Sequence, residues 1–236
     1  MTISVARQGF RIMGMAMLVG TLVSSTSVAS PSAEEYRQRG LALRQQGRLD
    51  EAIATLKQSV SLAPDHVSGQ VILGWTQHLA GQDDAATDTL VQAFYTDPFA
   101  VPTLNALGIV YLTSDKLSYA LTTHLWASVL NPENEIAYFN LSLAQHRLGY
   151  YDWAIATATK AAELEPGNPH PFIAKAIAHY SAGSIDLARE EYQRAIALRP
   201  WFATGAIELD LENAAFNPAQ IKLANEIQRK IQTGVN

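Results

Sequence analysis

A proline recurs every 34 residues along this chain. Five of the ten prolines lie on that spacing: Pro64, Pro98, Pro132, Pro166 and Pro200. A fixed period of this length is the signature of stacked supersecondary units, not of one irregular domain. It divides the chain into five units without insertions: 33–66, 67–100, 101–134, 135–168 and 169–202.

Three further features keep the same register inside every unit. An alanine stands twelve residues before each proline: Ala52, Ala86, Ala120, Ala154 and Ala188. A turn residue stands five residues before each alanine: Gly47, Gly81, Asp115, Gly149 and Gly183. Between them lies a residue type that favours helix N-caps: Asp50, Asp84, Ser118, Asp152 and Asp186. We therefore expect each unit to form a helix, a tight turn and a second helix capped at these residues, with the alanines allowing close helix approach.

These residues resemble the tetratricopeptide repeat family. Unit three carries the family's pattern most fully, in Leu104, Leu107, Gly108, Tyr111, Ala120, Ala127 and Pro132. Units four and five depart from it at Ser142, Lys175 and Ala176. A two-helix hairpin cannot bury its apolar face alone, so neighbouring units must stack. The expected fold class is all-α, and the resemblance implies a right-handed α-solenoid of five 34-residue repeats that serves as a binding scaffold.

Residues 203–236 break the register and are expected to form a C-terminal capping unit. The segment 203–216 can supply a first helix, and Asn217-Pro218 reads as the N-cap and first residue of a second one. That helix should run to about Gln232 and carry its apolar residues on one side. A basic docking role for its opposite side, through Lys222, Arg229 and Lys230, is the alternative.

The resemblance also places the binding surface on the concave wall, formed by the first helix of each unit. Positions five, nine and twelve of these helices give the candidate site, which is mostly apolar: Leu41, Val71, Trp75, Asn105, Ile109, Phe139, Leu143, His146, Ile173, Ile177 and Tyr180. The Asn and Lys or Arg pattern of the family's peptide-carboxylate clamp is absent. Either these residues are simply core, or the strip is covered by an apolar helical or extended segment of another protein, by the chain's own C-terminal helix, or by a second copy.

The N-terminal 30 residues have the pattern that is typical of a secretory signal peptide. Arg7 and Arg11 precede an apolar run from Ile12 to Val23, and small residues at Ser27 and Ala29 suit cleavage after Ala29. The run is short for a membrane span, although an uncleaved anchor is the alternative. We expect an exported protein of the periplasm or an equivalent compartment, whose mature form does not span the membrane.

Composition argues against several other functions. After residue 30 the chain holds 15 basic and 22 acidic side chains, which disfavours a nucleic-acid partner. Cysteine is absent, so thiolate catalysis and zinc-thiolate sites are excluded. No catalytic or metal-binding motif stands out, so we expect that the protein has no cofactor and is not an enzyme. If it were an enzyme, His146 beside Arg147 would be the best catalytic candidate. The expected function is an interaction scaffold in assembly or secretion of envelope components. The alternative is a self-associating structural subunit.

Overall fold

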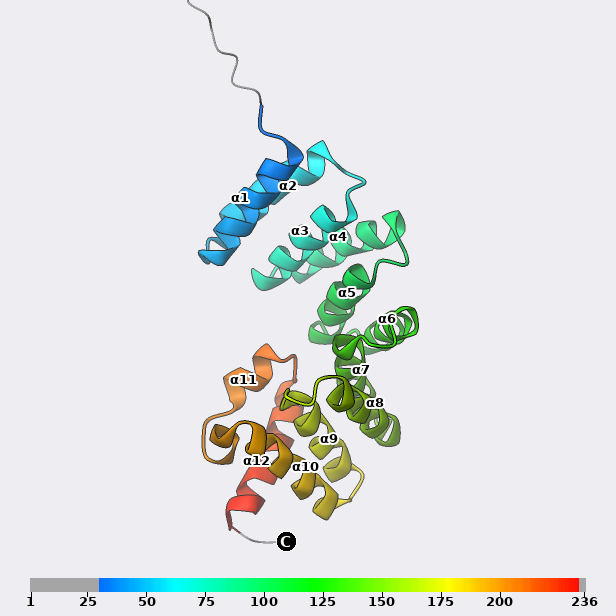
Figure 1. The fold of residues 1–236 in the computed structure, drawn as a ribbon, viewed down its shortest axis with the longest axis vertical. Helices are drawn as coiled ribbons and strands as arrows, with labels where there is room; N and C mark the ends of the chain where they lie inside the picture. The colour runs from blue at the N-terminus through cyan, green and yellow to red at the C-terminus, as the bar shows by residue number, and fades with distance from the viewer. Residues whose placement is uncertain (1–29, 234–236) are drawn as a thin grey trace, which may run out of the picture. The chain divides into compact units, whose positions relative to one another are not determined.

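The computed structural model describes residues 30–233. The expected signal peptide falls on residues that lie outside this described part. Within residues 30–233 the chain folds into twelve α-helices and one short 3-10 helix, with no strand (Figure 1). The fold is therefore all-α, as the repeat pattern predicts.

Ten of these helices form five sequential pairs with the 34-residue spacing. The first helices are α1 (Ala33–Gln45), α3 (Val67–Leu79), α5 (Val101–Thr113), α7 (Glu135–Arg147) and α9 (His170–Ser181). The second helices are α2 (Leu49–Leu62), α4 (Asp83–Thr96), α6 (Leu117–Leu130), α8 (Tyr151–Leu164) and α10 (Ile185–Leu198). Each pair packs closely within itself and then against the next pair, as in a tetratricopeptide-repeat solenoid.

The turn inside each pair needs a left-handed residue, and the predicted turn series supplies it. All five residues have positive φ, from 61° at Asp115 to 81° at Gly183. In the first turn the amide of Arg48 donates to the carbonyl of Leu43, and Gly47 donates to Arg44, which closes a Schellman motif. The prediction of a tight turn at these five positions is confirmed.

The predicted N-caps are wrong by two residues. The second helices begin earlier than expected, so that Asp50, Asp84, Ser118, Asp152 and Asp186 each occupy the second helical position. The actual N-cap residues, such as Arg48 and Lys116, make no side-chain capping bond. The Schellman turn sets where the second helix can start. The aspartates of this series therefore lie in the first turn of the helix, where their negative charge is stabilised by the helix dipole.

Small residues let the paired helices touch. The alanine series is buried in every unit, with at most 1% exposure. A Cβ added at Gly40 would lie 2.5 Å from the side chain of Leu56, and one at Gly74 would lie 2.6 Å from Leu90. The first helix therefore needs glycine at the position that faces a leucine of the second helix.

Two of the three departures from the family pattern, Ser142 and Lys175, are compensated locally. In unit four the pair equivalent to Gly40 and Leu56 is Ser142 and Ala158, so a larger residue on one helix meets a smaller one on the other. In unit five Lys175 pairs with the buried carboxylate of Glu191 at 2.9 Å. These changes alter the local packing without altering the helix register.

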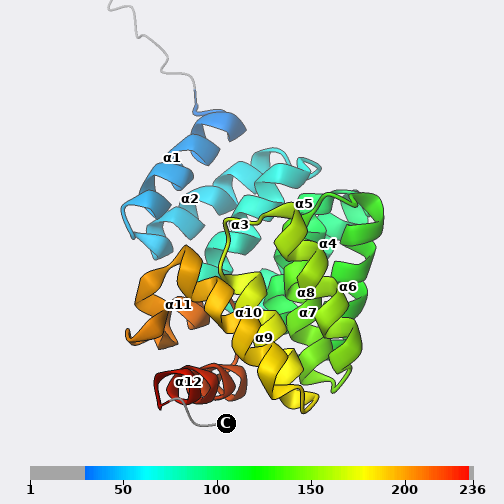
Figure 2. The same ribbon diagram turned by 60° about the horizontal axis from the view of Figure 1, so that its bottom comes forward.

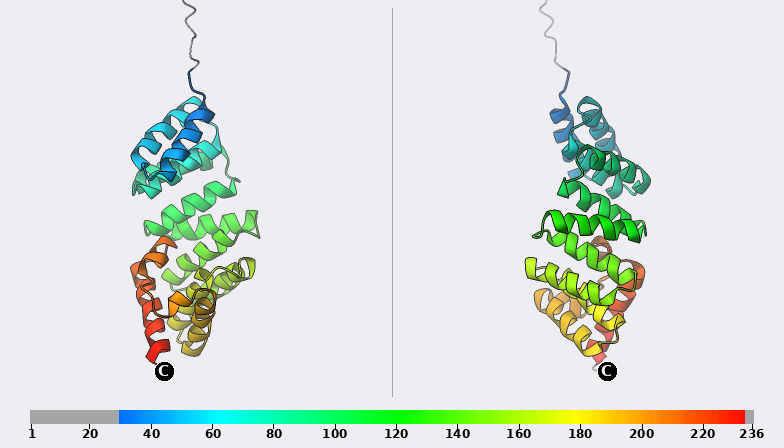
Figure 3. Two further views of the ribbon diagram at one scale, coloured as in Figure 1. Left: turned by 60° about the vertical axis from the view of Figure 1, so that its left-hand side comes forward. Right: turned by 90° about the vertical axis from the view of Figure 1, so that its right-hand side faces the viewer.

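The first helices line one wall of the repeat array. Consecutive first helices contact one another from α1 through to α9, whereas no two second helices share a comparable contact among residues 30–233. The first helices therefore lie on the inner side of the curve and the second helices on the outer side (Figures 1 and 3).

The C-terminal segment closes the array with η1 (Pro200–Ala203), α11 (Glu208–Asn213) and α12 (Pro218–Thr233). The first helix expected over 203–216 is reduced to six residues. Helix α12 begins where predicted: Asn217 Oδ1 accepts from the Gln220 amide at 2.9 Å, and Gln220 Oε1 accepts from the Asn217 amide at 3.1 Å. It then packs against α9 and α10, as two views show (Figures 1 and 2).

Candidate protein-binding groove

The inner wall has an open part in units one to three. Five of the eleven candidate residues lie here, and all are half-buried: Leu41, Val71, Trp75, Asn105 and Ile109. Each belongs to a first helix, and the ninth-position residues Leu41, Trp75 and Ile109 are spaced by whole units. They form a strip that retains access to solvent.

The same positions in units four and five are covered. Phe139 is 8% exposed, and Leu143, Ile173 and Ile177 are completely buried. They share one hydrophobic core with residues of the C-terminal unit: Phe202, Ile207, Leu211, Phe216, Ile221, Ala224 and Ile227. The chain's own C-terminal unit therefore occupies this part of the wall, so these four side chains are not accessible to a partner in the folded chain.

Polar side chains fix α12 in that place. The side-chain amide of Gln220 donates through Nε2 to the carbonyl of Leu143 at 3.2 Å and to His146 Nδ1 at 3.2 Å. Further along α12, the hydroxyl of Tyr180 donates to Glu226 at 2.5 Å, and Gln228 donates to the carbonyl of Phe202 at 2.8 Å. Both remaining candidate residues, His146 and Tyr180, thus hold the covering helix.

His146 is not arranged to act as a base. Because its Nδ1 accepts from Gln220, its Nε2 carries the proton and donates to Ser181 Oγ, 2.9 Å away. Burial, with a smaller contribution from the Arg147 charge, lowers the pKa of His146 to about 4. Arg147 is itself engaged by the carbonyl of Leu112, at 2.6 Å, and by Asp115. This pair therefore gives no catalytic dyad.

Short polar contacts lie at the edge of the open part. His78 Nδ1 lies 2.7 Å from Asp83, and its ring centroid lies 5.2 Å from that of Trp75. Asn105 on α5 and Asn134, the N-cap residue of α7, exchange side-chain hydrogen bonds of 2.9 and 3.3 Å. These contacts set the orientation of the Trp75 ring and of the Asn105 side chain.

A cleft of about 360 Å³ marks the boundary between the open and covered parts. Ile109 and Phe139 line it, together with Ala214 beyond α11. Glu135 also lines it, and burial followed by the neighbouring Glu165 charge raises the pKa of Glu135 to about 7. Asn168 donates to both carboxylates, at 3.3 and 3.2 Å.

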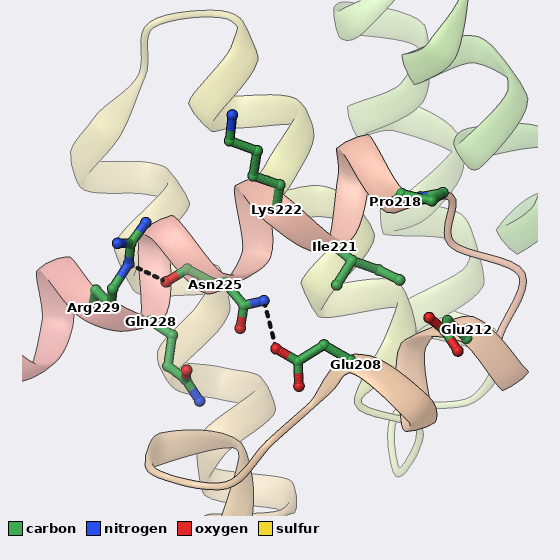
Figure 4. A pocket seen from close by; sticks show the side chains of 8 residues that line it. All are labelled: Glu208, Glu212, Pro218, Ile221, Lys222, Asn225, Gln228 and Arg229. Atoms are coloured by element: carbon green, nitrogen blue, oxygen red, sulfur yellow. Dashed lines mark hydrogen bonds between the residues drawn. The ribbon is translucent and has the colours of Figure 1, made fainter.

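A second cleft, of about 540 Å³, lies between α11 and α12 (Figure 4). Glu208 and Glu212 line it from α11, while Lys222 and Arg229 line it from α12. Asn225 joins the two helices through a 2.9 Å bond to Glu208. Because carboxylates and cations line the same cleft, α12 does not present a purely basic surface there.

The sequence patterns missed two buried side chains that shape this wall. Gln220 is 1% exposed, and its role depends on contacts 74 and 77 residues away, which no local pattern reveals. His124 is completely buried opposite Gly108, its ring nitrogens have no hydrogen-bond partner in the described part, and burial lowers its pKa to about 4. Its repeat position, shared with Leu56 and Leu90, is the signal that could have indicated burial.

Residues 30–233 contain neither a metal-binding cluster nor a membrane-spanning helix. No three His, Cys, Asp or Glu side chains come together there in a way that could hold a metal ion. In the same range, no helix combines the length and apolarity that crossing a membrane requires.

Comparison with known proteins agrees with this geometry. Two tetratricopeptide repeat family models match the chain, one at residues 33–66 and the other at residues 136–168. A search of curated protein sequences gave no match. The matched segments coincide with units one and four of the 34-residue register.

Solved structures with the same fold extend the likeness across the array. A MamA structure (MSR-1) is 26% identical and has a TM-score of 0.60, covering 70% of this chain and 95% of its own. YrrB, described as a tetratricopeptide-repeat protein with an unusual peptide-binding site, is 20% identical with a TM-score of 0.60, covering 72% and 87%. A thermophilic tetratricopeptide-repeat protein of Thermus thermophilus, TTC0263, is 23% identical with a TM-score of 0.59, covering 81% and 100%.

Units one and four are thus tetratricopeptide repeats, and the sequential helix pairs stack as in a tetratricopeptide-repeat solenoid. Proteins of this class are typically non-enzymatic scaffolds.

Proposed function

We propose that this protein is a non-enzymatic scaffold that binds an apolar segment of another protein on the open part of its inner wall. The observation that carries the proposal is the exposure pattern of one repeat position. Solvent still reaches the half-buried side chains of Leu41, Trp75 and Ile109, whereas Leu143 and Ile177 at the same repeat position are fully buried. An apolar strip that is left open, next to one that the chain covers itself, is a surface suited to an external segment.

The chemistry of the strip favours a segment with apolar anchors. Trp75 offers a large ring beside His78, and Val71 on the same helix and Leu41 on α1 add half-buried apolar side chains. Aromatic anchors of this kind contribute much of the binding free energy of protein interfaces. YrrB, a protein with a similar fold, has a peptide-binding site, which supports the same class of ligand.

We further propose that the scaffold works outside the cytoplasm, in assembly or secretion of envelope components. The basis is the sequence of residues 1–30 alone, with its basic start, short apolar run and small-residue cleavage site. Intact-mass measurement of the protein from envelope and cytosolic fractions tests this. A mature species beginning near Ser30 in the envelope supports export, and a cytosolic species that retains Met1 contradicts it.

Selection from a peptide-display library on the purified full chain tests the binding surface. Selected peptides should be rich in apolar residues, and Trp75→Ala should weaken their binding by about tenfold or more. Leu187→Ala, which removes an exposed apolar side chain on α10, is the control and should change the affinity by less than about twofold. Equal binding to Trp75→Ala and Ile109→Ala with both variants folded would exclude the open wall as the site.

A further inference from the structure

The outer face of α6 carries no charged residue. The six residues exposed on this helix are Ser118, Tyr119, Thr122, Leu125, Trp126 and Val129. Tyr119 is 65% exposed, Val129 59% and Leu125 49%. No Asp, Glu, Lys or Arg occurs between Lys116 and Glu133. The green helix that spans the right-hand view of Figure 3 therefore presents an uncharged, largely apolar surface, separate from the inner wall.

The other outer helices are different. Each of them exposes acidic side chains along its outer face, for example Glu51 on α2, Asp88 on α4, Glu163 on α8 and Glu190 on α10. Their faces are solvated in the way expected for the outside of a solenoid. An uncharged outer face on α6 among charged neighbouring helices indicates that this face contacts another molecule in the functional state.

Aromatic residues beside α6 enlarge this surface. A cleft of about 360 Å³ between α4 and α6 is lined by Phe94, Tyr95 and Tyr119, among other residues. At the far end of α6, the ring centroids of Phe99 and Trp126 lie 6.2 Å apart. The indole N–H of Trp126 donates to the carbonyl of Pro98 at 3.2 Å, so the part of the ring that faces solvent has no polar group left to satisfy.

The spacing on α6 fits another helix. Ser118, Thr122, Leu125 and Val129 follow one another at intervals of four, three and four residues, which is the seam spacing of packed helices. The small residues lie in the first half and the large residues in the second. When two such helices pack antiparallel about a two-fold axis, Ser118 faces Val129 and Thr122 faces Leu125 of the other copy. The seam is thus self-complementary in size.

Charge also favours a second copy as the occupant. The chain has a formal net charge of −5, so two copies repel over most of their surfaces. The α6 face is where they can approach without placing like charges opposite one another. We propose that the protein forms a two-fold symmetric dimer in which α6 of one copy packs antiparallel on α6 of the other. The contact is one helix wide, so the dimer should be weak, with a Kd in the micromolar range.

Single cysteines introduced into the full chain, which has none, test both the contact and its direction. In the antiparallel dimer the two copies of residue 122 are offset by about 4–5 Å along the helix axes, whereas the two copies of residue 118 are about 16 Å apart. Thr122→Cys should therefore give a covalent dimer with a short bis-maleimide, and Ser118→Cys should not. Crosslinking of both variants alike, or of neither, overturns the proposed pairing.

Sedimentation velocity over a concentration series of the full chain provides the equilibrium test. The wild type should shift from monomer to dimer, and Leu125→Glu with Val129→Glu should raise the Kd by at least tenfold. The matched control places the same charges on α2 and α10, as Leu62→Glu with Leu187→Glu, and should leave the Kd within about twofold of the wild type.

Three results overturn the proposal. One is a wild type that stays monomeric at about 100 µM. Another is a dimer that both double variants weaken equally. The third is a monomer that binds vesicles of phosphatidylcholine and loses this binding in Leu125→Glu with Val129→Glu, because the face would then be a membrane contact. None of these results bears on Trp75 or on peptide binding, so this proposal and the one for the inner wall can fail independently.

Discussion

The two parts of the inner wall are built from the same repeat positions, yet they differ in what covers them. In units one to three the ninth-position residues Leu41, Trp75 and Ile109 keep access to solvent. In units four and five the equivalent Leu143 and Ile177 are buried in a core that includes residues of the C-terminal unit. The repeat position therefore determines that these side chains lie on the inner wall, and the C-terminal unit determines whether they are exposed to solvent.

The covered part also shows which chemistry the wall accepts. Helix α12 presents Ile221, Ala224 and Ile227 from one side, and places the Gln220 amide on a backbone carbonyl of α7. The repeats share one register, so the open part offers half-buried apolar side chains at the same positions. The contrast between the two parts can be tested by changing matched residues in each.

The largest difference is expected for Leu143→Ala compared with Leu41→Ala, which remove the same side chain from the same repeat position. Leu143 is fully buried, so its truncation should lower the free energy of unfolding by about 2–5 kcal/mol. Leu41 is half-buried, and its truncation should cost less than about 1.5 kcal/mol. Chemical denaturation of both variants measures the difference; equal losses would mean that the wall is not divided.

A second effect is a fall in stability between pH 6.5 and pH 4. Burial lowers the pKa of His146 and of His124 to about 4, so the unfolded chain, with ordinary values near 6.5, binds more protons in this window. Acidification should therefore favour unfolding by about 1 kcal/mol per pH unit for each imidazole. Glu135, whose pKa burial raises to about 7, binds its proton in the folded state first and offsets about one imidazole between pH 6.5 and pH 4.5, so the net fall is about that of a single imidazole.

Denaturation of His146→Gln and His124→Leu across the same pH range tests this origin. Each variant should show a shallower decline than the wild type. A decline that stays unchanged in both variants would assign it to other groups.

A smaller effect is expected where α12 is fastened. Gln220→Ala removes the donor to Leu143 and to His146, which should cost about 1–2 kcal/mol. Asn225→Ala, in the same helix, loses only the 2.9 Å bond to Glu208 at the surface and should cost less than about 0.5 kcal/mol. Thermal unfolding ranks the two variants, and the reverse order would contradict the fastening of α12 by Gln220.

The smallest effect concerns salt. The open strip is apolar at Val71, Trp75 and Ile109, so the affinity for a selected peptide should change by less than about threefold between about 50 and 500 mM salt. Binding through Lys222 and Arg229 would instead weaken steeply as salt rises. Isothermal titration at several ionic strengths distinguishes the two surfaces.

The sequence predicts the fold well because its strongest signals are local and repeated. The period, the five turn residues and the alanine contacts each depend on neighbours within one unit, and all of them appear in the structure. The N-caps were misplaced because Asp50 and its equivalents suit the first turn of a helix as well as its cap. Here the preceding Schellman turn fixed where the helix starts.

The site is predicted less completely because its accessibility depends on distant contacts. The repeat register identifies the inner-wall positions, but nothing within units four and five indicates that α12 covers Leu143. The uncharged run after Lys116 was visible in the sequence and becomes informative only once α6 is known to face outward. The N-terminal 29 residues lie outside the described part, so export stays a prediction.

The division of the inner wall can be measured most directly by thiol labelling. Because the chain lacks cysteine, one can be placed at the ninth position of each unit in turn, by Leu41→Cys, Trp75→Cys, Ile109→Cys, Leu143→Cys and Ile177→Cys. The first three variants should react with a maleimide reagent at least about tenfold faster than the last two, since only the latter must first expose their thiols by local opening. Equal rates at all five positions, or protection in units one to three, would contradict an open wall beside a covered one.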